Sequence, residues 1–221
     1  MKIVVTCGPG SEPIDAVRRI TNFSTGELGI LMANRFIRAG HHVFCFKGYG
    51  ATTELPLAAG GELVEFVTNQ DLDSQLRGLP ERGKISVFFH AAALCDFRVK
   101  AVTDNAGEEL SAAKIPSQQN ALTLSLVPAK KLLPELKSIF PAAKIVGWKY
   151  ELNGDREDAL AAARRQLQTS NTIACVVNGL AYGSGFGFCM QGVAIKHFAD
   201  KVALAVFLED WLRGEDFDHK S

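Results

Sequence analysis

The chain has 221 residues, and its 24 basic and 24 acidic side chains balance to no net charge. This length, with 47% hydrophobic residues, predicts a globular α/β protein and excludes a largely disordered chain. The balanced charge excludes the strongly basic surface typical of nucleic-acid-binding proteins. No apolar run reaches the roughly 20 residues of a membrane span, and the N-terminus does not resemble a signal peptide. We therefore expect a cytoplasmic protein with neither a membrane nor a nucleic-acid partner.

The five cysteines form no C-x-x-C pair, and the five histidines are scattered along the chain. Both patterns disfavour a zinc site. The apolar neighbours of the cysteines favour buried, reduced thiols over disulfides. Metal ligands are therefore left unassigned by the sequence.

Short β-branched runs alternate with longer amphipathic stretches in the first half of the chain. Apolar residues at helical spacing predict a helix over 24–39, which stops at Gly40, and another over 69–79. The alternation predicts a Rossmann-like, doubly wound and mostly parallel sheet, whose ligands bind at the carboxyl ends of the strands. The predicted strands of this half cover residues 2–6, 43–46, 63–67 and 85–90.

The second half predicts additional strands within a single domain that spans residues 1–221. A Gly-rich stretch over 179–187 predicts turns, and a polar stretch over 100–117 predicts a mobile loop. The other predicted elements are strands over 121–127, 145–150, 172–177 and 193–198, and helices over 130–139, 155–168 and 200–211.

The first predicted strand ends in Gly8-Pro9-Gly10, a candidate phosphate-binding turn. A dinucleotide-binding fingerprint needs a third glycine three residues later and a helix directly after it, but Pro13 occupies that position. An NAD site is therefore disfavoured. Lys47, at the end of the second strand, could accept a 2′-phosphate, so an NADP-dependent reductase is an alternative. A tight turn without any ligand is another.

Two motifs carry a family resemblance. The run Gly10-Ser11-Glu12-Pro13-Ile14-Asp15, with Val17-Arg18 and Ile20-Thr21-Asn22-Phe23-Ser24-Thr25-Gly26, resembles the N-terminal signature of phosphopantothenate–cysteine ligases. Ala91-Ala92-Ala93-Leu94-Cys95-Asp96-Phe97-Arg98 resembles a second motif of that family. Lys114-Ile115, Val146-Gly147-Trp148 with Glu151, and Asn178 extend the resemblance over nearly the whole chain. It is a resemblance to the stand-alone ligase, without the flavoprotein decarboxylase domain, and implies no flavin.

The resemblance implies an acid–amino-acid ligase of coenzyme A biosynthesis. Such enzymes join 4′-phosphopantothenate to cysteine after a nucleoside triphosphate has activated the carboxylate as an acyl-nucleotide. That nucleotide is CTP in most bacteria and ATP in eukaryotes, and we expect CTP in preference to ATP here. The resemblance further implies Mg²⁺ and a homodimer, for which the predicted strand over 121–127 is the expected interface. Departures from the family pattern at Glu27, Trp148 and Gly179 leave another alternative, a diverged relative that binds a nucleotide without catalysis.

The resemblance also assigns residues. Lys114 is expected to counter charge at the α-phosphate, and Asn22 to hold the acyl-nucleotide, so both are expected to be catalytic. Asn22, Arg18 and Asn178 are expected to bind substrate. The expected nucleotide-binding residues are Gly8, Gly10, Ser11, Ser24, Gly26, Ala91, Ala92, Ala93, Asp96, Trp148, Arg164 and Arg165.

Some of these positions carry further expectations. Ser24-Thr25-Gly26-Glu27 matches a capping box, so Ser24 is expected to cap the helix and Glu27 to be structural, although many relatives are basic near Glu27. Relatives place two lysines on a later helix. Arg164 and Arg165 are the nearest candidates for this phosphate-binding role, with Lys130 and Lys131 as others. His90, at the end of a buried strand, is expected to be a core histidine.

Overall fold

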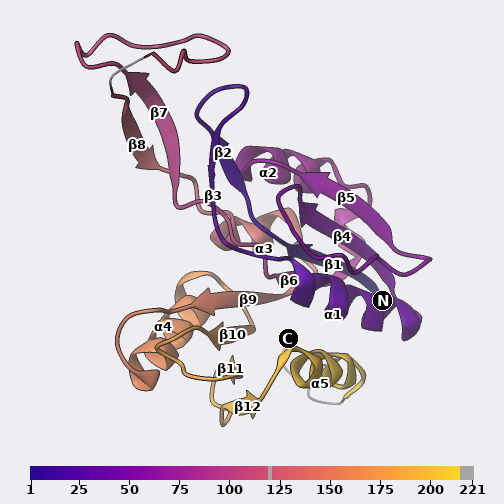
Figure 1. Ribbon diagram of the computed structural model, residues 1–221. Coiled ribbons are helices and arrows are strands. Elements are labelled where there is room, and N and C mark those ends of the chain that lie inside the picture. The colour runs from indigo at the N-terminus through magenta and orange to yellow at the C-terminus, as the bar shows by residue number, and fades with distance from the viewer. Residues whose placement is uncertain (119–120, 215–221) are drawn as a thin grey trace.

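The computed structural model describes residues 1–118 and 121–214 and centres on one eight-stranded sheet (Figure 1). The strands lie in the order β12-β11-β10-β9-β6-β1-β4-β5. Neighbours from β10 to β5 pair in parallel, while β11 and β12 pair antiparallel at one edge. This confirms the predicted Rossmann-like, mostly parallel sheet. The strands are β1 (Lys2–Cys7), β4 (His42–Gly48), β5 (Glu62–Phe66), β6 (Ile85–His90), β9 (Lys144–Tyr150), β10 (Ala174–Asn178), β11 (Phe186–Met190) and β12 (Lys196–Phe198).

Helices cover both faces of the sheet, because successive side chains of each buried strand point to opposite sides. Ile3 and Val5 of β1 pack with residues of α1 (Glu27–Arg38) and α5 (Lys201–Arg213). Val4 points the other way and packs with residues of α2 (Asn69–Gly78) and α3 (Leu136–Ile139). The remaining helix, α4 (Arg156–Thr169), packs on β10 on this second face.

α1 crosses β1 at a point where the helix has no side chain. A β-carbon added at Gly29 would lie 2.1 Å from the β-carbon of Cys7, closer than packed atoms allow. We therefore expect Gly29→Ala to lower the free energy of unfolding by about 3 kcal/mol, measured by denaturant titration. Gly78→Ala is the matched control, because no atom lies within 4 Å of its added β-carbon. Its change should stay within about 1 kcal/mol, and equal losses in both variants would contradict the packing explanation.

Two short ribbons project from the carboxyl edge of the sheet (Figure 1). The first pairs β2 (Ser11–Pro13) with β3 (Arg19–Thr21), and the second pairs β7 (Phe97–Thr103) with β8 (Thr123–Pro128). The loop predicted over 100–117 is wrong at its start, because residues 100–103 belong to β7. The error arose because pairing with β8 orders a stretch that is polar in composition.

The start of α1 also differs from the expectation. The helix begins at Glu27, and its N-cap is Gly26, with a φ of 76° and no side-chain hydrogen bond to the cap. The predicted capping by Ser24 is therefore wrong. Glu27 instead forms an ion pair with Lys201 at the start of α5, so its partner comes from the far end of the chain.

Three later boundaries differ as well. The helix predicted over 130–139 is a 3₁₀ turn at Leu133–Glu135 followed by the short α3, because Pro134 disfavours a helical residue before it. β11 begins inside the predicted turn region over 179–187, since Phe186 and Phe188 face the core. β12 is shorter than the predicted strand over 193–198. Within residues 1–118 and 121–214, no helix is long and apolar enough to cross a bilayer.

Candidate functional site

The glycine turn after β1 lies directly against the segment that follows β6. The Gly10 amide donates to the Ala93 carbonyl at 3.0 Å, and the Ala93 amide donates to the Gly8 carbonyl at 2.9 Å. A β-carbon at Gly10 would lie 2.8 Å from Oδ1 of Asn69. Glycine is therefore favoured here because the Asn69 side chain leaves no room for a β-carbon. The two backbone hydrogen bonds join the two motifs of the sequence at the carboxyl edge of the sheet.

Asn22, directly after β3, ties the first ribbon to the same segment. Its side-chain Nδ2 donates to the carbonyls of Ala93 at 3.0 Å and Leu94 at 2.9 Å. Both amide hydrogens are thereby engaged by backbone. The amide oxygen has no hydrogen-bond partner among the residues that the structure describes, so it is the atom of Asn22 that can face a ligand as an acceptor.

Asp15 and Arg18 hold the segment that carries Lys114. The Asp15 carboxylate accepts hydrogen bonds from the Arg18 side chain and from the Ile115 amide, and Arg18 also donates to the Ile115 carbonyl at 2.7 Å. Hydrogen bonding to Arg18 holds the pKa of Asp15 well below its usual range, so the carboxylate stays ionised. Arg18 therefore positions the backbone around Lys114, whose own side chain is exposed.

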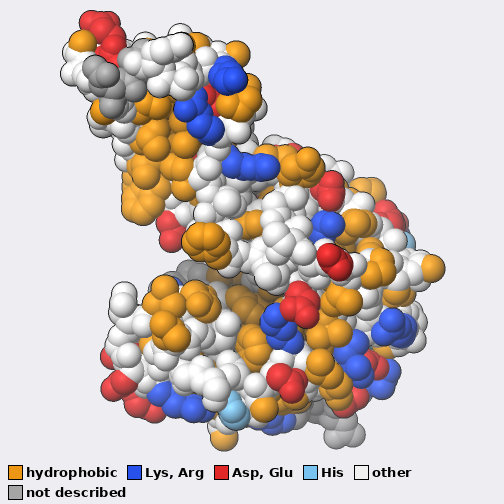
Figure 2. Space-filling model, in the orientation of Figure 1, with side chains coloured by type: hydrophobic (Ala, Val, Ile, Leu, Met, Phe, Trp, Pro, Cys, Tyr) orange, Lys and Arg blue, Asp and Glu red, His pale blue; other side chains and the backbone are white. Residues whose placement is uncertain are grey.

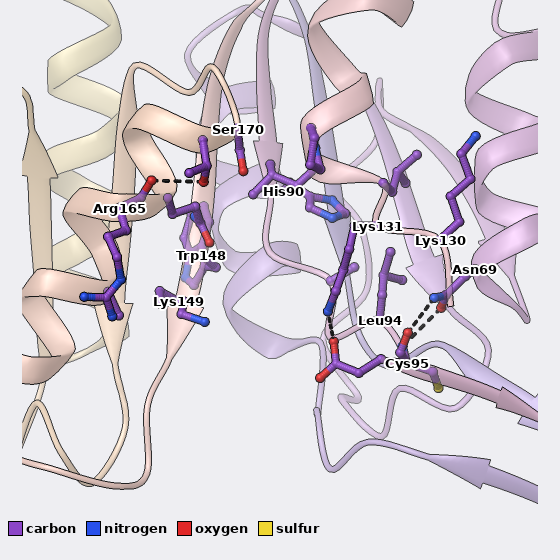
Figure 3. Close-up of a pocket in the computed structure, with 18 of the residues that line it drawn as sticks. Asn69, His90, Leu94, Cys95, Lys130, Lys131, Trp148, Lys149, Arg165 and Ser170 are labelled. Atoms are coloured by element: carbon purple, nitrogen blue, oxygen red, sulfur yellow. Dashed lines mark hydrogen bonds and ion pairs between the residues drawn. The ribbon is translucent and has the colours of Figure 1, made fainter. Parts of the chain in front are cut away.

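A first cavity of about 420 Å³ opens between α4 and the segment after β8, over the ends of β6 and β9. Figure 3 shows Lys149 and Arg165 on one side, Lys130 and Lys131 on the other, and His90 between them. Four expected nucleotide-binding residues line this cavity: Ala92, Asp96, Trp148 and Arg165.

Three of the four cations in the first cavity already have carboxylate partners. Lys131 pairs with Asp96, Lys149 with Glu151 at 3.0 Å, and Lys130 with Glu135 at 2.7 Å. Arg165 forms no ion pair with any residue that the structure describes, so its guanidinium is available to an anion. The cavity therefore offers a cationic lining to a phosphorylated ligand.

His90 ends β6 at the base of this cavity. It is 7% exposed, and its Nδ1 lies 2.7 Å from Oγ1 of Thr6, which agrees with the expected core histidine. Burial lowers the pKa of His90 to about 4, because the charged imidazolium loses its hydration. The side chain is neutral at physiological pH.

The lowered pKa predicts a pH-dependent stability. In the unfolded chain His90 takes up a proton near its ordinary pKa of 6.5, and in the folded protein only near 4, so the free energy of unfolding should fall as pH drops through this window. The full loss is about 3 kcal/mol. Denaturant titrations of wild type and His90→Gln at several pH values check this. The variant should lose less stability on acidification, and parallel curves would contradict the assignment.

Other expected site residues lie elsewhere. Arg164 faces away from the first cavity and is 3.9 Å from Glu157. The Ser11 hydroxyl is buried and donates to the Val67 carbonyl at 3.0 Å. Asn178 lines a second cavity, of about 850 Å³, on the α1 and α5 face of the same sheet edge. Neither cavity is lined by Asn22 or Lys114.

The structure adds residues that the sequence did not single out. Lys149 lines the first cavity at the end of β9, beside Glu151 of the family resemblance, and the rule that ligands bind at strand carboxyl ends could have found it. Asn69, at the start of α2, is bonded to the Cys95 backbone through both its amide atoms, at 2.8 and 3.1 Å. From the sequence, Asn69 indicated only the start of the helix predicted over 69–79.

The expected Mg²⁺ can be compared with the side chains that could ligate it. In the described part of the chain, no group of three or more His, Cys, Asp or Glu side chains could hold a metal ion. A protein cage for Mg²⁺ therefore does not fit these residues, and no chemical step is assigned to a metal. Mg²⁺ commonly binds through substrate phosphates with few protein carboxylates.

The fold and the carboxyl-edge cavities define a Rossmann-like α/β protein with a candidate ligand site at one edge of its sheet. A family model described as the DNA/pantothenate metabolism flavoprotein C-terminal domain matches residues 1–204, and the chain belongs to this family. This confirms the family resemblance carried by the two motifs.

Individual relatives of the chain are consistent with this family. The chain is 32% identical over 187 residues to the coenzyme A biosynthesis bifunctional protein CoaBC of Thermococcus kodakarensis, covering 83% of this chain and 42% of the relative. It is 30% identical to the CoaBC protein of Bacillus subtilis, covering 84% of this chain and 42% of the relative. The chain thus spans less than half the length of these relatives.

Two solved structures share the fold. A DNA/pantothenate metabolism flavoprotein from Streptococcus pneumoniae has a TM-score of 0.83 at 24% identity, covering 96% of this chain and 98% of that one. A Cab2 variant in complex with phosphopantothenate-cysteine has a TM-score of 0.72 at 19% identity, covering 98% and 87%.

Proposed function

We propose that this chain is a phosphopantothenate–cysteine ligase of coenzyme A biosynthesis. The observation that carries the proposal is the joining of both motifs at one sheet edge: Asn22 is bonded to the Ala93–Leu94 backbone, while Asp15 and Arg18 hold the segment around Lys114. Family membership and the ligand named for the Cab2 variant support the same function.

The reaction needs two displacements. The carboxylate of 4′-phosphopantothenate attacks the α-phosphate of a nucleoside triphosphate, CTP in preference to ATP, and pyrophosphate leaves. The cysteine amine then attacks the acyl carbon, the nucleoside monophosphate leaves, and the amine loses a proton. Both steps gather negative charge, so catalysis depends on positioning and on cations.

In this mechanism Lys114 counters charge at the α-phosphate and Asn22 holds the acyl-nucleotide. Arg165 and the lysines of the first cavity meet phosphate oxygens, and Asp96 exchanges its Lys131 partner for ligand. Arg18 and Asn178 contribute to substrate binding. The other proposed nucleotide contacts are Gly8, Gly10, Ser24, Gly26, Ala91, Ala92, Ala93 and Trp148. Ser11 and Arg164 are left out, because the Ser11 hydroxyl is bonded to Val67 and Arg164 faces away from the first cavity.

The β7–β8 ribbon supports a homodimer. Figure 2 shows hydrophobic side chains gathered over this ribbon, and Phe97 and Leu126 are 54% and 45% exposed. A two-stranded ribbon is marginally stable alone, so a second copy packed on this face would stabilise it.

We expect Leu126→Asp to shift the protein from dimer to monomer in light scattering. Leu152→Asp, at a side chain 51% exposed elsewhere, should not, and a monomeric wild type would contradict the proposal.

The direct test is pyrophosphate release with 4′-phosphopantothenate, cysteine and a panel of nucleotides. Turnover that needs all three substrates supports the ligase. Nucleotide binding without turnover would instead favour a diverged, non-catalytic relative. For the reductase alternative, Lys47 is the candidate 2′-phosphate contact and lies 3.5 Å from a Glu65 carboxylate oxygen. No change in nicotinamide fluorescence on titration with NADPH would remove that alternative.

A further inference from the structure

His90 has one ring nitrogen inside the protein and the other at the first cavity. Its ring packs beside Phe88, with centroids 6.1 Å apart, and lies between Lys131 and Trp148 (Figure 3). Nδ1 lies 2.7 Å from the Thr6 hydroxyl oxygen. Nε2 has no hydrogen bond with any residue that the structure describes, and protein atoms do not enclose it fully. Nε2 is therefore the nitrogen that a ligand in this cavity can reach.

The Thr6 hydroxyl determines which nitrogen carries the ring proton. Thr6 is fully buried, and its Oγ1 has no second hydrogen-bond partner among residues 1–118 and 121–214. If Nδ1 donated to Oγ1, the hydroxyl proton would lack an acceptor in the core, which is unfavourable. If the hydroxyl donates to Nδ1, both groups are satisfied and the proton resides on Nε2. Because burial lowers the pKa of His90 to about 4, the ring presents a neutral N–H donor to the cavity.

An N–H donor at the base of a cationic cavity suits a phosphate group. Four cations line the same cavity: Lys130, Lys131, Lys149 and Arg165. The three lysines already pair with carboxylates, whereas Nε2 has no competing partner in the described chain. A phosphate has at least three acceptor oxygens, so one oxygen can meet the ring while others meet the cations at the sides.

We propose that Nε2 of His90 donates a hydrogen bond to a phosphate oxygen of the ligand in the first cavity, and that Thr6 positions the ring for this contact. The inference rests on the proposed function for the identity of that ligand. The phosphate belongs either to the nucleoside triphosphate or to 4′-phosphopantothenate. His90 directly precedes Ala91, Ala92 and Ala93, so the donor lies on the segment already proposed to contact the nucleotide.

Nuclear magnetic resonance of protein labelled with ¹⁵N in histidine tests both the tautomer and the contact. His90→Gln identifies the His90 signals by their loss. At neutral pH, wild type should show a protonated Nε2 and an unprotonated Nδ1. The Nε2 signal should shift on saturation with CTP or with 4′-phosphopantothenate, and the ligand that shifts it is the source of the phosphate. Cytidine and pantothenate lack the phosphate and should not shift it.

Two results of this experiment would overturn the proposal. One is a ring proton on Nδ1. The other is an Nε2 signal that neither phosphorylated ligand shifts at saturation, or that cytidine or pantothenate shifts equally. Because the measurement uses wild type, it tests the proposal even if a variant at this buried position fails to fold.

Dissociation constants measured by calorimetry test the same contact in variants. His90→Leu removes the donor and should weaken binding of the phosphorylated ligand about tenfold or more. His90→Gln keeps an N–H donor and should recover most of the affinity. Thr6→Val should weaken binding alone but add little to His90→Leu, because the two residues act as one unit. His42→Leu, at the start of β4, is the matched control and should stay within about twofold of wild type.

The variants separate failure of this contact from failure of the proposed function. If wild type shows turnover with all three substrates while His90→Leu keeps wild-type affinity, the contact is overturned and the ligase is supported. If wild type binds neither CTP nor 4′-phosphopantothenate, both are overturned. Equal losses of affinity in His90→Leu and His90→Gln would show that the ring acts by packing, which would overturn the donor role.

Discussion

Replacing Lys114 by alanine is expected to lower kcat of the proposed ligase by about 10²–10³-fold, because one fixed cation at the α-phosphate stabilises the charge that develops there. Folding should be unaffected. The segment is held by the backbone of its neighbours, through the Ala113 carbonyl to the Ala16 amide at 2.8 Å and the Ile115 contacts with Asp15 and Arg18. Stopped-flow detection of pyrophosphate release measures the loss.

Lys100→Ala is the matched control for this variant. Lys100 is an exposed lysine on β7 of the same projecting ribbon, so its removal changes the net charge and the ribbon composition equally. It should keep kcat within about twofold, as exposed substitutions away from a site do. Wild-type turnover in Lys114→Ala, or an equal loss in Lys100→Ala, would remove Lys114 from the mechanism.

Asn22→Ala is expected to lower kcat by about 10²-fold, through loss of a fixed polar group at the acyl-nucleotide. The same substitution also frees the Ala93 and Leu94 carbonyls, which Asn22 holds at 3.0 and 2.9 Å. Single-turnover kinetics should therefore show a slower chemical step, and nucleotide affinity should fall less than kcat.

Asn69→Ala separates these two effects. Asn69 anchors Cys95, the next residue of the same connection, by hydrogen bonds of 2.8 and 3.1 Å. If Asn22 acts on the ligand, Asn69→Ala should cost less than about tenfold in kcat, as lost positioning of one loop does. Equal losses in the two variants would show that Asn22 acts by holding the backbone.

The Asp15–Arg18 contacts explain part of the N-terminal signature. Its acidic and basic residues lie in a turn between β2 and β3 and bind the backbone around Ile115, 100 positions later for Asp15. A positively charged residue in a family signature suggests a phosphate contact when only the sequence is read. In this structure the Arg18 guanidinium is engaged by Asp15 and by a carbonyl, so at least part of its contribution is to place Lys114.

The sequence by itself determined the parallel sheet, the covering helices and the two motifs, because strand and helix periodicity is a local property of the chain. It missed β7 and β11, whose pairing partners lie elsewhere in the chain and outweigh polar or Gly-rich composition. It also assigned Glu27 to a local cap. Only the tertiary structure decided that Glu27 meets Lys201, that Arg165 but not Arg164 reaches the first cavity, and that Asn178 lies at the second. These outcomes depend on which elements the folded chain brings together, and local periodicity does not encode such long-range neighbours.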